Sequence, residues 1–160
     1  MAAKILIVDD HEIVRAGIRT LLEQSGTDWE VCGEAANAND ALIAVKNLKP
    51  DVVILDITMP GTSGLVAAQR MSKLGVSSRI LIFTMHESEM LEGEVRDAGA
   101  HGYVLKSQAA RDLIVAIQSL LGGGTFFRSS SRSFAPGDEE SGPGIIFFKA
   151  FAQLAPLRCR

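Results

Sequence analysis

The sequence predicts an α/β fold: a doubly wound, five-stranded parallel sheet with helices on both faces. Two observations support this prediction. Short apolar runs alternate with stretches of helical periodicity from residue 5 to residue 121, and repeated strand–helix units form parallel sheets with right-handed crossovers. In addition, the segment Asp51–Leu55 (DVVIL) is apolar at every position after the first, which is typical of a strand buried on both faces.

Each element is predicted from its own pattern. The expected strands are Ile5–Val8, Trp29–Gly33, Asp51–Leu55, Arg79–Phe83 and Gly102–Leu105. The second is more polar than the others, as an edge strand would be. Helical spacing of apolar residues predicts helices over Glu12–Gln24, Asn37–Leu48, Leu65–Leu74, Glu87–Ala98 and Gln108–Leu121. Either Asn37 or Asn39 would cap the second helix, and Pro50 would end it.

Composition favours one ordinary globular domain. The chain has 160 residues and a formal net charge of -3, which argues against non-specific affinity for nucleic acid or an anionic membrane. No apolar run approaches the roughly 20 residues of a membrane helix, and we expect no signal peptide. Cys32 and Cys159 lie far apart and outside any zinc-type spacing, so we expect a reduced, cytoplasmic protein.

Polar residues end four of the five predicted strands. Asp9 and Asp10 follow the first strand, Asp56 the third, Thr84 the fourth and Lys106 the fifth. The carboxyl ends of parallel strands lie at one edge of a sheet, where doubly wound folds bind their ligands. We therefore expect these side chains to converge.

The charges of this group suggest a metal site. Three carboxylates against one ammonium leave two negative charges uncompensated, and one divalent cation would balance them. Carboxylate oxygens without thiolate or imidazole suit Mg²⁺ or Mn²⁺; without the cation, repulsion should raise a carboxyl pKa. Such a site is equipped for phosphoryl transfer. The plainer alternative is that Asp9 and Asp10 only cap the first helix.

Four motifs in order connect these residues to a known family. "IVDDHEIVRAGI", "DVVILDITMPGTSGL", "ILIFTMHE" and "AGAHGYVLKSQ" resemble the receiver domain of two-component response regulators from residue 4 to about 121. "TMH" and "HGYVLK" look like the NarL/FixJ (LuxR-type) subfamily. The resemblance implies a flavodoxin-like fold with strand order 2-1-3-4-5 and a sensor histidine kinase as partner. We expect phosphorylation to be read out on the surface of the fourth helix, the fifth strand and the final helix, and a homodimer is one form that this output could take.

The resemblance also implies a role for each site residue. Asp56 would be the phosphoacceptor, and Asp9, Asp10, Asp56 and the backbone carbonyl of Thr58 would hold Mg²⁺ (or Mn²⁺). Lys106 would bind the phosphoryl oxygens. Thr84 would donate its hydroxyl to the phosphoryl group, and Tyr103 would respond as the second switch residue, although a lone tyrosine also serves simple packing.

Two further expectations concern neighbouring residues. Many receivers have a cis proline after the lysine, whereas Ser107 stands here; a cis bond before Ser107 is disfavoured, so the path of this loop is open. The histidines His11, His86 and His101 lie in polar or loop contexts, and we expect them to be solvated and not to bind metal.

The last part of the chain does not continue the resemblance. We expect a receiver domain over 1–124 and an atypical flexible tail without a recognisable domain over 125–160, because "RSSSRSFAPGDEESGPG" has linker composition. "IIFFKAFAQLAPL" is a short apolar segment that would suit a partner. No helix-turn-helix pattern is present, so DNA binding by this chain is not supported. A frameshift and a genuine interaction segment are both open explanations.

Two functional classes remain open from the sequence. The first is a phosphoaccepting signalling module with no enzymatic activity beyond its own phosphorylation and dephosphorylation. The second is an Mg²⁺-dependent phosphohydrolase with an aspartate nucleophile, of the haloacid-dehalogenase type. That type expects a second acid two residues after the nucleophile, where this chain has Thr58, so the signalling class is favoured.

Overall fold

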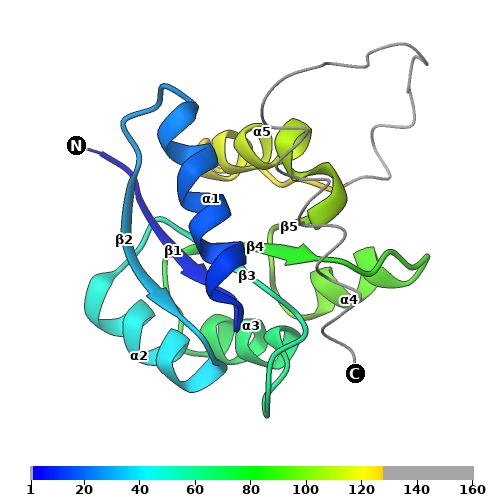
Figure 1. The fold of residues 1–160 in the computed structure, drawn as a ribbon. Helices are drawn as coiled ribbons and strands as arrows, with labels where there is room; N and C mark the ends of the chain where they lie inside the picture. The colour runs from blue at the N-terminus through cyan, green and yellow to red at the C-terminus, as the bar shows by residue number, and fades with distance from the viewer. Residues whose placement is uncertain (1, 128–160) are drawn as a thin grey trace.

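The computed structural model describes residues 2–127, which form one parallel sheet of five strands in the order β2-β1-β3-β4-β5 (Figure 1). The strands are β1 (Lys4–Val8), β2 (Glu30–Ala35), β3 (Val52–Leu55), β4 (Arg79–Thr84) and β5 (Gly102–Leu105). The helices are α1 (Glu12–Gln24), α2 (Ala38–Leu48), α3 (Gly64–Lys73), α4 (Leu91–Asp97) and α5 (Ala109–Leu121). The predicted fold class and strand order are confirmed.

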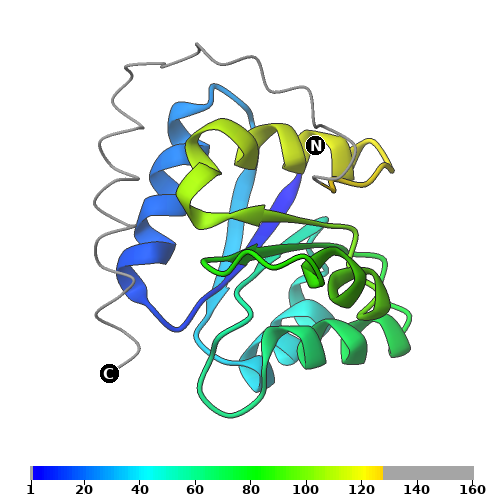
Figure 2. The same ribbon diagram turned by 90° about the vertical axis from the view of Figure 1, so that its right-hand side faces the viewer.

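The sheet separates two apolar layers. Figure 2 shows α1 and α5 on one side of it and α2, α3 and α4 on the other. The side chains of β1 alternate between the two apolar layers. Ile5 and Ile7 pack with α1 and α5, while Leu6 and Val8 belong to the layer beneath α2, α3 and α4. Because side chains of a strand alternate between faces, burial of both faces requires an unbroken apolar run. Polar side chains are thereby confined to the ends of the strands.

Most helix boundaries match the expectation to within a residue or two, and α4 is the exception. It begins at Leu91 and not at Glu87. Met90, at the N-cap position, makes no capping hydrogen bond, and the first apolar side chain that the helix buries is Leu91. In contrast, Asn37, one of the two caps predicted for α2, is the residue that caps this helix, since its side chain accepts a hydrogen bond from the Asp40 N–H. Within residues 2–127, no helix is long and apolar enough to cross a membrane.

The pairing of β1 with β2 contains a bulge. Ile5 is paired with Val31 and Leu6 with Gly33, so Cys32 is the extra residue. Beyond the bulge the register continues with Ile7 opposite Glu34. A bulge shifts which residues of an edge strand face its neighbour, and here it determines that Glu34 lies beside the carboxyl end of β1.

The chain after α5 packs on the far edge of the sheet. Phe126 accepts a hydrogen bond from the Tyr103 N–H and donates its own N–H to the His101 carbonyl, both at 3.0 Å, and so extends the sheet beyond β5. Gly102 makes this possible, because a Cβ at this position would overlap the Phe126 backbone. Phe127 is buried: its ring meets Tyr103 edge-on at 6.2 Å, and Arg96 lies 3.7 Å from its centroid.

These contacts bear on the expected division of the chain. Residues 125–127 were assigned to the tail by composition, yet they are tied to β5. The domain boundary at residue 124 stays a prediction, and the contacts favour a receiver unit that includes Phe127. The apolar segment "IIFFKAFAQLAPL" and Cys159 lie outside the described residues.

We predict that Phe127→Ala destabilises the domain by about 2–4 kcal/mol, because the substitution removes a buried aromatic ring and its packing with Tyr103 and Arg96. Denaturant unfolding of the full chain measures the change. Thr125→Ala is the matched control, because that side chain is exposed. Equal stability of the two variants would show that the contact at Phe127 contributes nothing to the fold.

Candidate functional site

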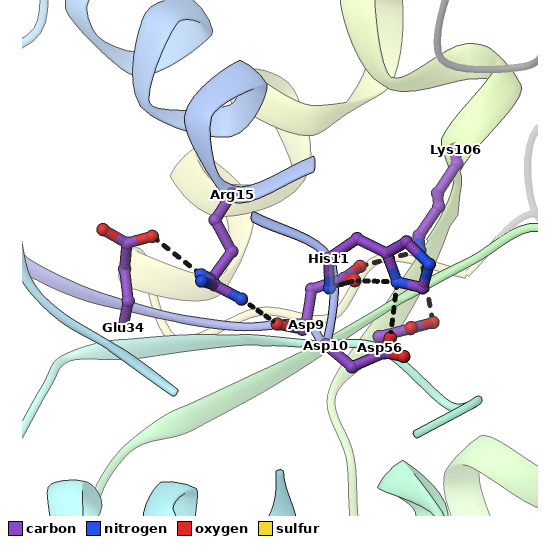
Figure 3. A network of polar contacts seen from close by, with 7 residues as sticks. All are labelled: Asp9, Asp10, His11, Arg15, Glu34, Asp56 and Lys106. Carbon is purple, nitrogen blue, oxygen red and sulfur yellow. Dashed lines mark hydrogen bonds and ion pairs between the residues drawn. The ribbon is translucent and has the colours of Figure 1, made fainter. Parts of the chain in front are cut away.

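The carboxyl ends of the strands bring the predicted residues to one edge of the sheet (Figure 3). Asp9, Asp56 and Lys106 come from three different strand ends and are only 1%, 3% and 3% exposed. Buried ionisable side chains are rare unless they are paired. Their concentration at this edge therefore needs either mutual charge compensation or a ligand.

Lys106 supplies part of that compensation. Its ammonium donates a hydrogen bond to Asp9 Oδ2 at 2.7 Å and lies 3.3 Å from Asp56 Oδ1. Lys106 follows β5, whereas Asp9 follows β1, so the side chain spans the ends of β3 and β4. One ammonium thus serves two carboxylates of the acidic group.

Asp10 lies at the more open side of the site. Its carboxylate is 2.9 Å from His11 Nδ1, and the His11 ring is also 3.6 Å from Asp9 Oδ1. Among the described residues, Asp9, Asp10 and His11 form a group whose potential ligand atoms lie within 4.8 Å of one another. His11 is therefore engaged with the acid pair, contrary to the expectation that it is simply solvated.

His101 departs from the same expectation. The ring Nδ1 of His101 accepts a hydrogen bond of 2.9 Å from the Ile80 backbone N–H. The backbone N–H of His101 donates to the Ile80 carbonyl at 2.8 Å. Burial, assisted by the charge of Arg79, lowers the pKa of His101. The neutral ring thus extends the pairing of β4 with β5 and lies away from the acid pair, at the opposite end of β5.

The carboxyl group of Asp56 is perturbed by its surroundings. Burial, together with the charges of Asp9 and Asp10, outweighs the attraction of Lys106 and raises the pKa of Asp56 from 3.8 to about 7. Its Oδ2 is buried and has no hydrogen-bond partner within the described part of the chain. Raised carboxyl pKa was the consequence expected for crowded acids without a cation. Because Asp56 Oδ2 accepts no hydrogen bond from the described residues, it is available to a cation or to a reacting group.

The loop after β3 is held close to Asp56. Gly64 begins α3, and a Cβ there would overlap the Asp56 carbonyl. The Gly64 N–H donates to the Ile57 carbonyl at 2.8 Å, and the Ser63 hydroxyl caps the helix at Leu65. Thr58 is an exposed residue of this same loop. Its carbonyl as a metal ligand remains a prediction.

The two predicted switch residues lie on neighbouring strands. Thr84 ends β4, is 1% exposed, and its hydroxyl accepts a hydrogen bond of 3.2 Å from the His86 N–H. Tyr103 of β5 pairs with Ile82 and is covered by Phe127. The Lys106–Ser107 peptide bond is trans, and the chain passes through a 3-10 turn, Lys106–Gln108, into α5.

Sequence reasoning missed two residues beside the acid pair. Arg15 of α1 donates a hydrogen bond from Nη1 to the Asp9 carbonyl at 2.6 Å and from Nε to Glu34 at 2.9 Å. Glu34 of β2 also binds Arg19, at 2.6 Å. The sequence signal was slight: a basic residue in the first helix and one acid in a polar edge strand. Their meeting depends on the register of β2.

The donor set fits a hard divalent cation. Carboxylate oxygens dominate it, Asp56 Oδ2 has no hydrogen-bond partner among the described residues, and burial beside two other acids raises the pKa of Asp56. These are the ligand types that Mg²⁺ and Mn²⁺ accept, whereas zinc sites use thiolate and imidazole. Asp9, Asp10 and Asp56 are the residues that would hold the cation, with Asp10, whose side chain is 20% exposed, on the more accessible side.

The sheet order 2-1-3-4-5 and an acidic site with a lysine at its carboxyl edge are the features expected of a receiver domain. The family model for the response regulator receiver domain matches residues 5–118. The chain therefore belongs to the response regulator receiver family. That family consists of signalling domains, so the signalling class holds over the phosphohydrolase class.

Individual relatives agree. The chain is 38% identical over 125 residues to the response regulator UvrY of Escherichia coli K12, and 40% identical over 124 residues to the oxygen regulatory protein NreC of Staphylococcus epidermidis. These alignments cover 78% and 77% of this chain but 57% and 56% of the relatives. The chain thus matches little more than half the length of these curated relatives.

Solved structures give the same result. A LuxR-family two-component response regulator from Aurantimonas sp. SI85-9A1 matches with a TM-score of 0.74 and 34% identity, over 96% of this chain and 99% of that one. The isolated receiver domain of RcsB from Salmonella enterica, determined with the phosphomimetic BeF3⁻, matches with a TM-score of 0.72 and 26% identity, over 92% and 99%. The resemblance to LuxR-type regulators is confirmed.

The raised pKa of Asp56 has a consequence for stability. A carboxyl group whose pKa is higher in the folded than in the unfolded chain stabilises the fold below pH 3.8, and this stabilisation is lost as the pH rises through about 7. We therefore predict that Asp56→Asn increases the free energy of unfolding of the metal-free protein at pH 8 by about 2–4 kcal/mol.

Denaturant unfolding at several pH values measures this difference, which should shrink steadily as the pH falls from 8 toward 4. Asp28→Asn is the control, because Asp28 is exposed, and we expect no such trend for it. A difference between Asp56→Asn and the parent chain that did not change with pH would contradict the pKa assigned to Asp56.

Proposed function

We propose that this chain is a phosphoaccepting receiver: in the cytoplasm, Asp56 takes a phosphoryl group from a phosphohistidine of a sensor kinase, with Mg²⁺ or Mn²⁺ as cofactor. The observation that carries the proposal is the state of Asp56 itself. It is buried, its Oδ2 lacks a partner among the described residues, and Lys106 is 3.3 Å from its Oδ1. Membership of the receiver family supports the same role.

The side chains suggest how the transfer is assisted. An Asp56 carboxylate oxygen attacks phosphorus, the P–N bond to the donor histidine breaks, and its electron pair remains on the imidazole nitrogen. Lys106 is held by Asp9 at 2.7 Å, so its ammonium is already in place to bind the new phosphoryl oxygens. When bound by Asp9, Asp10, Asp56 and the Thr58 carbonyl, the cation supplies positive charge that offsets the carboxylates and the phosphoryl oxygens.

The raised pKa of Asp56 fits this role. A nucleophilic carboxylate must be ionised to attack, and burial beside two other acids opposes ionisation. Divalent cation binding favours the charged form, since it adds opposite charge close to the carboxylate. Reactivity and cation binding are therefore expected to be linked, because a bound cation increases the ionised fraction of Asp56.

The partners follow from this function. A sensor histidine kinase would dock over the carboxyl edge of the sheet, and phosphorylation would change a surface that a partner, such as a second copy of the chain, recognises. The curated relatives extend well beyond the matched region, so the process that the signal controls is not implied by the receiver alone. DNA binding is not proposed for the described residues.

We predict that the full chain gains one phosphoryl group when it is incubated with a small-molecule phosphodonor and Mg²⁺, and none with EDTA. Intact-mass spectrometry measures the gain. Asp56→Asn should abolish it while the fold is retained, because the amide keeps the shape of the carboxyl group. Asp28→Asn, a change of the same kind at an exposed position, should be labelled like the parent chain.

Labelling that persisted in Asp56→Asn would show that another residue is the acceptor. Turnover separates the phosphohydrolase alternative from the receiver. A receiver holds one acyl phosphate per chain, whereas a phosphohydrolase releases inorganic phosphate from small esters many times over, and a free-phosphate assay measures that release.

The response to phosphorylation is expected along β4 and β5. A phosphoryl group adds roughly two negative charges and new acceptor oxygens at Asp56. Thr84, at the end of the neighbouring strand, has a hydroxyl that can donate to them, and movement of the 84–86 loop would free space for Tyr103. The short helix α4 lies between Thr84 and Tyr103 in the sequence and buries only Leu91 and Val95. We therefore expect its displacement to require little free energy.

We predict that a beryllofluoride phosphoryl mimic changes hydrogen exchange mainly in residues 84–108, and that Thr84→Ala largely removes this change. Exchange followed by mass spectrometry measures it. Thr27→Ala serves as the control, because Thr27 lies in the loop between α1 and β2, away from the site. Changes restricted to the surroundings of Asp56, or equal in Thr84→Ala and the parent chain, would rule out the Thr84–Tyr103 switch.

A further inference from the structure

The end of β1 is held from the side opposite to Lys106. Figure 3 shows the Arg15 guanidinium between Glu34 and the backbone of Asp9, with Lys106 and Asp56 on the other side. Arg15 Nη1 donates to the Asp9 carbonyl oxygen at 2.6 Å, and Arg15 Nε donates to Glu34 Oε1 at 2.9 Å. We propose that Arg15, held by Glu34, is a positioning residue for the acid pair. The inference rests on the proposed function.

Every polar group of Asp9 has a partner in this arrangement. Its N–H donates to the Ala35 carbonyl at 3.1 Å, and its carbonyl accepts from Arg15. Its carboxylate accepts from the His11 N–H at 2.9 Å and from Lys106 at 2.7 Å. The carbonyl that Arg15 binds belongs to the peptide group joining Asp9 to Asp10. Its orientation therefore sets the direction from which the Asp10 side chain leaves the backbone.

Glu34 compensates the positive charge of Arg15. Although burial favours the neutral acid, hydrogen bonds from Arg19 and Arg15 lower the pKa of Glu34, so it is ionised at neutral pH. The Arg15 charge is thus compensated on the β2 side of the site. The contacts of the guanidinium are with Glu34 and with the Asp9 carbonyl oxygen, whereas Lys106 binds the Asp9 carboxylate.

The planar fork of arginine is what allows both contacts at once. Nε binds Glu34 while Nη1 binds the carbonyl, and a lysine has one nitrogen at the end of a flexible chain. The side chain is also well enclosed, at 16% exposure. A change of Arg15 to lysine is therefore expected to retain the positive charge, but a lysine would not bind Glu34 and the Asp9 carbonyl at the same time.

Arg19 provides a matched control within the same cluster. It binds the other oxygen of Glu34, with Nε at 2.7 Å, from the next turn of α1. Its side chain is 40% exposed. Removal of Arg19 deletes an ion pair to Glu34 but leaves the contact of Arg15 with Asp9. Comparison of the two arginines therefore separates support of the acid pair from general stabilisation of α1 against β2.

Direct Mn²⁺ binding to the full chain, followed by electron paramagnetic resonance without any phosphodonor, tests the proposal. We expect Arg15→Gln and Arg15→Lys to weaken binding about tenfold, the lower end of the effect of removing a partner that orients a metal ligand. Arg19→Gln should stay within about twofold of the parent chain. Glu34→Gln should weaken binding as Arg15→Gln does, and it decides the test if Arg15→Gln does not fold.

Phosphorylation gives a second readout. In Arg15→Lys the Mg²⁺ concentration for half-maximal labelling should rise about tenfold, whereas the rate at saturating Mg²⁺ should change much less, because the cation then holds the acid pair in place. Equal Mn²⁺ affinity in the Arg15 and Arg19 variants would overturn the positioning role. A parent chain that binds no Mn²⁺ and is not labelled at Asp56 would instead overturn the proposed function, and this inference with it.

Discussion

The buried ion pair between Lys106 and Asp9 is the interaction on which the site depends. Both side chains are at most 3% exposed, and burial of either charge alone would cost several kcal/mol. The pair joins the ends of β1 and β5, which are separated in the sheet by β3 and β4, and the same ammonium lies 3.3 Å from Asp56. The Lys106 ammonium contacts two of the three acids, so one positive charge faces three carboxyl groups. Burial, together with the charges of Asp9 and Asp10, raises the pKa of Asp56, and a divalent cation would offset both effects.

The location of the site follows from how the sheet is buried. Apolar layers cover both faces of the strands, so a charged group inside a strand would be unpaired in a dry environment. The ends of the strands are the first positions at which the backbone can carry such groups. Gly64 and Gly102 then let other segments approach closely, at the Asp56 carbonyl and at the Phe126 backbone respectively. A layered fold with these close approaches gives a rigid edge on which acidic groups are held against their mutual repulsion.

The fold and the central site residues were predictable because they depend on local patterns. Unbroken apolar runs identify strands buried on both faces, and the residues that end them must meet at one edge of a parallel sheet. Contacts that depend on register were not predictable in this way. The Arg15–Glu34 pair requires the bulge at Cys32, which no local pattern marks. Residues 125–127 were grouped with a tail of linker composition. Gly102, however, leaves room for the Phe126 backbone beside β5, and the Tyr103 N–H donates to the Phe126 carbonyl.

The same register-dependent contacts connect the site to the end of the described chain. Thr84 pairs with Leu105 and Ile82 with Tyr103. A displacement of the end of β4 would therefore act on β5 through these backbone pairs. Tyr103 packs against Phe127, and Phe127 lies under Arg96 of α4. Packed side chains transmit a displacement only when they have two discrete arrangements. The edge-on contact of Tyr103 with Phe127 offers a path of this kind, because a movement of the tyrosine ring toward Phe127 would displace residues 125–127 at the edge of the sheet.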